Sequence, residues 1–187
     1  MQDEIKKAVE TVKNGGVILY PTDTVWGIGC DATNAQAVER IYKIKRRADS
    51  KALITLVDSE NRLQTYVEQV PNVAWDLLDC IEEPLTIIYP KGKNLAPNLL
   101  AENGSVAIRV TKEKVSKMLC FKLQRPIVST SANLSGEPSP QNFSQISSEI
   151  RAAVDYIVPL RQNEKKAAQP SKIIALEVDG RFKIIRD

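Results

Sequence analysis

Two apolar runs in this sequence end directly in small polar side chains, and this pattern constrains the fold more than any other feature. The run Val17–Tyr20 predicts a buried strand, which Pro21 ends and which Thr-Asp-Thr at 22–24 follows. The run 126–129 predicts a second strand, and the polar segment 129–133 continues from it. In open α/β sheets, ligands bind in the crevice beyond such strand ends. The two segments therefore predict a polar ligand site at one edge of a sheet.

Each segment taken alone also has a structural interpretation. Residues 22–24 could be an ordinary connection after a strand, and Ser131-Ala-Asn133 could be a turn or a helix cap, because Ser and Asn favour both. Gly27 and Gly29 do not complete a dinucleotide-binding loop, since the third glycine of that motif is absent.

The rest of the sequence predicts one α/β domain over residues 1–187 with a mixed sheet. A two-residue turn at Asp179-Gly180 joins the last two expected strands, 134–141 is a loop, and 161–170 is the segment we expect to be flexible. The expected helices are 4–14, 34–45, 59–67, 71–81, 114–123 and a short one within 143–150, and the expected strands are 17–20, 53–57, 85–89, 105–110, 126–129, 156–158, 172–178 and 182–185.

Composition excludes several classes of chemistry. The 187 residues contain no histidine, which rules out Ser-His and Cys-His nucleophilic catalysis and histidine metal ligands. The three cysteines, Cys30, Cys80 and Cys120, are too far apart for a zinc knuckle or a redox pair, so we expect buried free thiols. There is no signal-peptide pattern and no apolar run near the ~20 residues that span a bilayer. We therefore expect a cytoplasmic protein without membrane association.

A basic cluster at residues 43–51 holds five cations in nine residues, although the net charge of the chain is only +3. Cations suit the C-terminal end of a helix, and a solvated basic face is common. The same residues could instead form a phosphate cradle, because a nucleotide triphosphate needs several cations and arginine matches phosphate oxygens in shape. No Walker-type phosphate loop is present. Composition alone leaves both interpretations open.

Taken together and in order, these motifs resemble the YrdC family of threonylcarbamoyl-AMP synthases, in its single-domain form. The matching segments are YPTDTVWGIGCDA (20–32), the K-x-R of 45–47, EPLTIIYP (83–90), SVAIRV (105–110), the S-x-N of 131–133 with PSP at 138–140, and PSKII (170–174). The resemblance implies an open, twisted mixed sheet flanked by helices, with a basic concave cavity. It also implies conversion of L-threonine, bicarbonate and ATP to threonylcarbamoyl-AMP and pyrophosphate, for threonylcarbamoyladenosine modification of tRNA next to the anticodon.

The resemblance implies a role for individual residues as well. Lys45, Arg47, Ser131 and Asn133 would be catalytic; Arg47, Lys51, Ser105, Ser131, Ser139 and Arg186 would bind ATP; and Thr24, Arg109, Ser129 and Ser171 would bind threonine. Gly27 and Gly29 would let the backbone close on a small amino acid. Magnesium would arrive on the ATP phosphates without a protein metal site. Implied partners are a downstream threonylcarbamoyl transferase complex and a contact to tRNA or double-stranded RNA.

This chemistry suits a chain without histidine. Every reacting species is anionic, so catalysis rests mainly on positioning and on charge neutralisation by lysines, arginines and hydroxyl groups. Two alternatives stay open: an RNA-binding or ribosome-maturation module, and a nucleotide-binding relative with weak activity. Departures from the family pattern at Ala48, Leu56, Thr111 and Lys172 motivate the second.

Overall fold

The computed structural model describes residues 1–46, 53–164 and 169–187. Arg47, Ala48 and Lys51 fall outside these residues. Within the described ranges, no helix is long and apolar enough to cross a membrane. The α-helices are α1 Gln2–Lys13, α2 Ala35–Lys45, α3 Leu63–Tyr66, α4 Asn72–Cys80, α5 Lys114–Leu123 and α6 Ser148–Ala153, and short 3₁₀ turns cover Glu60–Arg62, Pro97–Leu99 and Phe143–Gln145.

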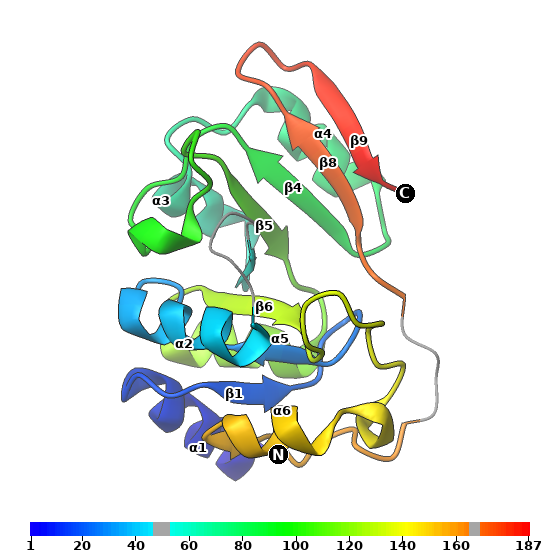
Figure 1. Ribbon diagram of the computed structural model, residues 1–187. Helices are drawn as coiled ribbons and strands as arrows, with labels where there is room; N and C mark the ends of the chain where they lie inside the picture. Colours follow the sequence, from blue (N-terminus) through cyan, green and yellow to red (C-terminus); the bar gives the residue numbers. More distant parts are fainter. Residues whose placement is uncertain (47–52, 165–168) are drawn as a thin grey trace.

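The strands form a nine-stranded sheet in the order β7-β1-β2-β6-β3-β5-β4-β8-β9. Three neighbouring pairs are parallel, β1 with β7, β3 with β5, and β4 with β8, and the other pairs are antiparallel. The predicted open, twisted mixed sheet is therefore confirmed, and Figure 1 shows its twist from β1 to β9. The strands are β1 Ile18–Tyr20, β2 Gly27–Gly29, β3 Ile54–Val57, β4 Leu85–Tyr89, β5 Val106–Val110, β6 Ile127–Ser131, β7 Tyr156–Ile157, β8 Lys172–Leu176 and β9 Phe182–Arg186.

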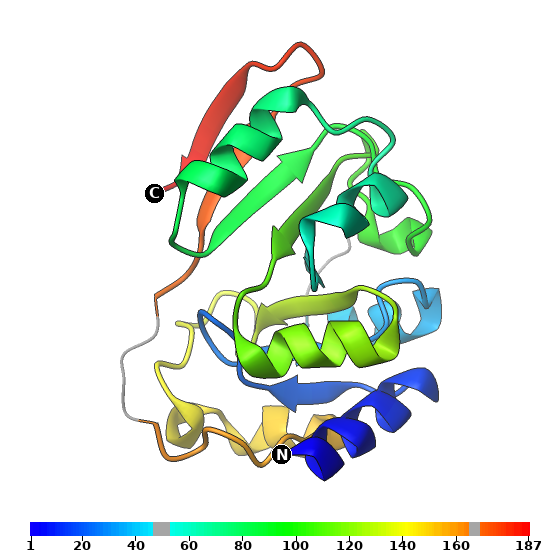
Figure 2. The same cartoon turned by 180° about the vertical axis from the view of Figure 1, so that it is seen from behind.

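Helices cover both faces of the sheet. Side chains alternate between faces along a strand, so Leu19 of β1 packs with α2 and α6, whereas Ile18 and Tyr20 pack with α1 and α5. Figure 1 shows α2 and α6 in front of the sheet, and Figure 2 shows α1, α4 and α5 on the other side. Burial of each such apolar side chain contributes about 1.5–3 kcal/mol. The helices thereby fix the strands whose ends carry the polar segments.

Strand β2 was not predicted from the sequence, and the predicted role of Gly29 is wrong. The segment Gly27–Gly29 pairs with β1 on one side and β6 on the other. A Cβ atom at Gly29 would come within 2.4 Å of the Val128 carbonyl oxygen and 2.6 Å of the Tyr20 ring. Gly29 therefore makes room for the Tyr20 ring inside the sheet and not for a small amino acid. Two glycines in a three-residue strand hide the usual β pattern, because they carry no side chains to alternate.

Replacing Gly29 with alanine is expected to lower the free energy of unfolding by about 1–3 kcal/mol, the usual cost of overpacking a core. Neither the Val128 carbonyl nor the buried Tyr20 ring can move away cheaply. Thermal and urea unfolding measure the loss. The Gly180→Ala variant shows the cost of backbone strain without overpacking, since open space surrounds that position and only its φ of +86° opposes the change. Equal stability of the Gly29→Ala variant and the parent would contradict this explanation.

Smaller differences concern the ends of elements. The expected helix 59–67 is a 3₁₀ turn followed by the short α3, and the expected helix within 143–150 is divided between a 3₁₀ turn and α6. Cys30 and Cys120 are buried free thiols as predicted, and burial raises the pKa of both. The prediction was wrong for Cys80, which is exposed because it ends α4 on the side away from the core.

Candidate functional site

A cavity of about 290 Å³ lies where β5, β6 and β8 meet the loop after β1. Two guanidinium groups and several hydroxyl groups line it, together with apolar residues of the sheet. The structure thus brings together segments that lie far apart in the sequence. Seven residues predicted for the site line this cavity: Thr24, Arg109, Ser129, Ser131, Ser139, Ser171 and Arg186.

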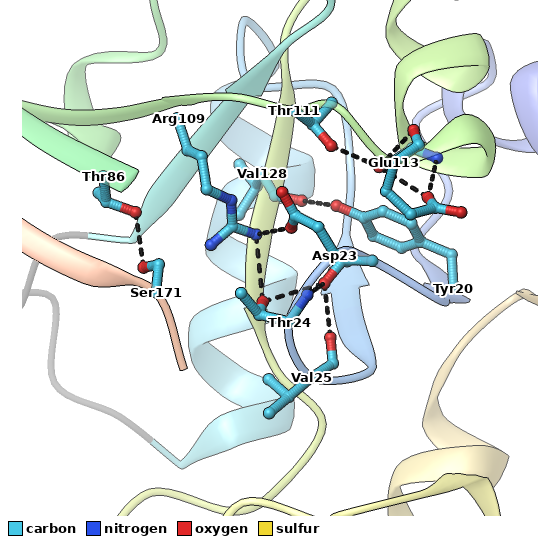
Figure 3. Close-up of polar contacts among 12 residues, drawn as sticks. Tyr20, Asp23, Thr24, Val25, Thr86, Arg109, Thr111, Glu113, Val128 and Ser171 are labelled. Carbon is cyan, nitrogen blue, oxygen red and sulfur yellow. Dashed lines mark hydrogen bonds and ion pairs between the residues drawn. The ribbon is translucent and has the colours of Figure 1, made fainter. Parts of the chain in front are cut away.

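Arg109 of β5 is the most deeply buried cation of the cavity, with only 3% of its side chain exposed. Its Nη2 lies 3.0 Å from Oδ1 of Asp23 and donates to Oγ1 of Thr24 at 3.3 Å (Figure 3). The Asp23 contact is an ion pair without the geometry of a hydrogen bond, so Oδ1 of Asp23 accepts no hydrogen bond and Nε of Arg109 donates none. Burial raises the pKa of Asp23, and the charge of Arg109 opposes this shift.

The loop that carries Asp23 and Thr24 is held in one shape. The Thr22 hydroxyl donates to the Val25 carbonyl at 2.7 Å and accepts from the Thr24 backbone N–H at 3.1 Å. From outside the loop, Arg161 donates to the Thr22 carbonyl at 2.9 Å and pairs with Glu113 at 3.1 Å. These contacts fix the Thr24 hydroxyl in the wall of the cavity. Arg161 belongs to no motif and lies in the segment expected to be flexible, so its role could not be predicted.

The opposite wall comes from the end of the chain. The buried hydroxyl of Ser171 lies 2.8 Å from that of Thr86, and Arg186 donates to the Ser171 carbonyl at 2.8 Å (Figure 3 shows the Thr86 contact). Burial lowers the pKa of Arg186, and the positive charge of Arg109 adds to this effect. Two guanidinium groups that repel each other across one cavity favour an anionic ligand between them. Thr86 was not predicted as a site residue, because nothing in the expected strand 85–89 distinguishes it from its neighbours.

Lys45 links the two motifs that the sequence analysis singled out. Only 2% of this residue is exposed, and its Nζ donates to the carbonyl oxygens of Ser131 at 2.5 Å and Asn133 at 2.8 Å. Asn133 in turn donates from Nδ2 to the carbonyls of Leu134 and Glu137, at 2.9 and 2.7 Å. The C-terminal end of α2 is thereby fastened to the loop after β6. Lys45 and Asn133 do not line the first cavity; they hold the backbone of the loop that carries Ser131, which does.

Ser105 lies apart from the other predicted residues. It precedes β5 and lines a neighbouring hollow of about 490 Å³, which shares Ile88 with the first cavity. Arg47 and Lys51 lie outside the described residues, so the structure places only Lys45 of the three cations expected to face phosphate.

A second cavity, of about 510 Å³, adjoins the first. Thr24 and Pro170 line both, and Asp23 lines the second, so the residues 23–24 stand at the junction between the two. Lys172 at its rim pairs with Asp187 at 3.1 Å. In the part of the chain that the structure describes, no group of three or more Cys, Asp or Glu side chains could hold a metal ion.

The described departures from the expected family pattern lie outside the first cavity. Leu56 is buried among α1 and α5, the Thr111 hydroxyl lies 2.7 Å from that of Ser116, and Lys172 belongs to the second cavity. None of these three residues therefore contributes to the lining of the first cavity.

Comparison with known proteins agrees with this arrangement. The family model for Sua5, YciO and YrdC proteins, described as "Telomere recombination", matches residues 10–187. The chain belongs to the Sua5/YciO/YrdC family. Among curated members of this family, a protein of Pseudoalteromonas translucida named threonylcarbamoyl-AMP synthase is 37% identical over 177 residues, 92% of each chain. One of Xanthomonas euvesicatoria with the same name is 35% identical over 174 residues, 91% of each chain.

Solved structures of the Sua5/YciO/YrdC family share the fold. E. coli YciO superposes with a TM-score of 0.86 at 29% identity, over 100% of this chain and 90% of that one. P. abyssi Sua5 complexed with L-threonine superposes with a TM-score of 0.79 at 26% identity, over 92% of this chain. This chain spans 50% of the P. abyssi protein. The fold class predicted from the resemblance is thus confirmed by relatives of known structure.

Proposed function

We propose that this protein is a threonylcarbamoyl-AMP synthase, a nucleotidyltransferase that makes threonylcarbamoyl-AMP and pyrophosphate from L-threonine, bicarbonate and ATP. The observation that carries the proposal is the first cavity, which joins seven residues of the expected motifs around the buried guanidinium group of Arg109 and the more exposed one of Arg186. Relatives named threonylcarbamoyl-AMP synthase that match more than 90% of the chain support it, as does the threonine complex of P. abyssi Sua5.

We assign threonine to the wall formed by Thr24, Arg109, Ser129 and Ser171, since Arg109 can receive a carboxylate and the hydroxyls can meet the polar side chain. ATP would then extend past Ser131 and Ser139 toward Arg186, and into the hollow that holds Ser105. Arg47 and Lys51 would complete the phosphate side. Lys45 and Asn133 would act by positioning the Ser131 loop, because the Lys45 ammonium donates to that loop's carbonyl groups.

The reaction proceeds in two steps. Bicarbonate takes up a proton and loses water to give carbon dioxide, and the α-ammonium group of threonine loses a proton to give the neutral amine. The amine attacks carbon dioxide, which forms a C–N bond and, after loss of a further proton, a carbamate. A carbamate oxygen then attacks the α-phosphorus of ATP, and the bond to the departing pyrophosphate breaks. Both steps gather negative charge in a small space, which Arg109 and Arg186 offset. No step needs a histidine or a covalent enzyme intermediate.

We propose that magnesium binds through the ATP phosphates. The polar groups that line the first cavity fit this, because they are hydroxyls and guanidinium groups and include no carboxylate.

We also propose that the protein works in the cytoplasm, where a threonylcarbamoyl transferase complex would use the product to modify tRNA. A direct contact to tRNA or double-stranded RNA is a further part of the proposal.

The purified protein is expected to release pyrophosphate from ATP only when L-threonine and bicarbonate are both present. A coupled phosphate assay measures the release, and mass spectrometry identifies threonylcarbamoyl-AMP. The activity of the Arg47→Ala and Lys45→Ala variants is expected to be greatly reduced, since the first removes a cation expected to face phosphate and the second removes the ammonium that positions the Ser131 loop.

The same assay separates the alternatives. ATP turnover that is indifferent to threonine would contradict the synthase assignment, and so would an absence of turnover combined with tight RNA binding. A weakly active relative would instead show threonine-dependent release at a low rate.

A further inference from the structure

We propose that the carboxylate of Asp23 receives the α-ammonium group of the amino-acid substrate, while Arg109 receives its carboxylate. This assignment rests on the proposed function, and it adds to that function a residue that decides between amino acids and hydroxy acids. The motif resemblance assigned no role to Asp23. Three observations support the assignment.

The first observation is the position of Asp23 at the junction of two cavities. Arg109 lines the first cavity, Thr24 lines the first and the second, and Asp23 lines the second and also a third one of about 220 Å³. Nη2 of Arg109 lies 3.0 Å from the Asp23 carboxylate and 3.3 Å from the Thr24 hydroxyl, so the three groups converge (Figure 3). An α-amino acid carries its two charges on groups attached to one carbon atom. A ligand beside Thr24 would therefore present its carboxylate to Arg109 and its ammonium to Asp23.

The second observation is that the ion pair does not satisfy itself. Arginine and carboxylate commonly form two parallel hydrogen bonds, which leave no buried atom without a partner. Here Nε of Arg109 has no acceptor and Oδ1 of Asp23 has no donor, although both atoms are shielded from solvent. Such atoms cost free energy when they stay unpaired. A zwitterion supplies one acceptor group and one donor group, which matches the two unpaired atoms when the side chains part slightly to admit it.

The third observation is that the loop backbone on either side of Asp23 is held in place. The Thr22 hydroxyl bonds within the loop to Val25 and Thr24. Arg161 fastens the Thr22 carbonyl to Glu113, the residue that caps α5. A carboxylate on a loop whose backbone is held loses less freedom on binding, which strengthens its contact with the ligand.

The arrangement predicts discrimination between an amine and a hydroxyl at the α-carbon. An ammonium donates three hydrogen bonds and carries a charge opposite to that of Asp23. A hydroxyl donates one hydrogen bond and carries no charge, so it lacks the ionic attraction that an ammonium has for the Asp23 carboxylate. The difference should amount to about tenfold to a hundredfold in affinity, the usual range for a charge-assisted hydrogen bond.

The test compares two ligands on two proteins. The ligands are L-threonine and its analogue with an α-hydroxyl in place of the amine, and calorimetry measures their dissociation constants on the wild type and on Asp23→Asn. The wild type is expected to prefer threonine by at least about tenfold. Asp23→Asn should bind the analogue nearly as well as the wild type does, but it should lose most of the preference for threonine.

A matched control is Asp31→Asn, which removes a similarly buried carboxylate paired with Arg125 at 2.8 Å, away from both cavities. It should keep the full preference for threonine, and circular dichroism should show all three proteins folded. If Asp23→Asn does not fold, Asp23→Ser serves in its place. If Asp23→Asn weakens the binding of both ligands equally, Asp23 only orients Arg109, and this result would overturn the assignment. A wild type that binds no threonine would instead overturn the proposed function itself.

Discussion

Replacing Arg109 with lysine is expected to raise the KM for L-threonine by about a hundredfold or more, although the positive charge is kept. The loss of a buried charge-assisted contact of this kind costs about 2–5 kcal/mol. Lysine presents a single ammonium and not a planar fork, so it cannot contact Asp23, Thr24 and a substrate carboxylate together. Steady-state pyrophosphate release at varied threonine concentration measures the change. The KM for ATP should rise much less, because Arg186 still lies in the cavity.

The matched control for this prediction is Arg125→Lys. Arg125 also pairs with a buried aspartate, at 2.8 Å, but 55% of its side chain is exposed and it lies outside the cavities. The control should keep the KM values for threonine and ATP within about twofold of those of the wild type, since an exposed ion pair contributes little to stability. An Arg109→Lys enzyme with the threonine KM of the wild type would place the substrate carboxylate elsewhere in the cavity.

The sequence predicted those parts of the site that lie along single strands. Ser129, Thr130 and Ser131 are consecutive at the end of β6 and all line the same cavity, because the strand ends there in the predicted polar segment. The motif resemblance supplied the residues that no periodicity could supply, such as Ser171 and Arg186. Both proved to line the same cavity as β6, and Arg186 donates to Ser171.

Contacts between distant segments could not be predicted in this way. The ion pair of Asp23 with Arg109 and the contacts of Lys45 with the Ser131 loop, 86 residues away, follow from the sheet order, in which β6 lies between β2 and β3. That order depends on how β2 pairs. Strand β2 could not be recognised in the sequence, because its two glycines have no side chains to form the alternating apolar and polar pattern of a strand. A charged residue in a polar segment, such as Asp23, likewise gives no sign of its partner before the fold is known.

Replacing Lys45 with methionine is expected to lower both stability and activity. Methionine fills a similar volume, but it leaves the buried carbonyl groups of Ser131 and Asn133 without this donor. The cost should be about 2–5 kcal/mol in the free energy of unfolding, since one to two buried acceptors lose a charged partner. The turnover number should fall by about tenfold or more even where the variant is fully folded, because the loop that carries Ser131 loses its attachment to α2. Urea unfolding and pyrophosphate release at low temperature separate the two effects.

Lys43→Met on the same helix is the control. The Lys43 side chain is 73% exposed and pairs only weakly with Glu39, at 3.5 Å, so its loss should change neither stability nor turnover measurably.

The Lys45→Met variant also distinguishes two roles for the lysine of the K-x-R motif. A lysine that only supplied charge to ATP would lower activity when replaced, without a matching loss of stability. Because the Lys45 ammonium is buried against two backbone carbonyls, the two losses should occur together. A Lys45→Met protein with the stability of the wild type would show that the lysine acts on substrate alone.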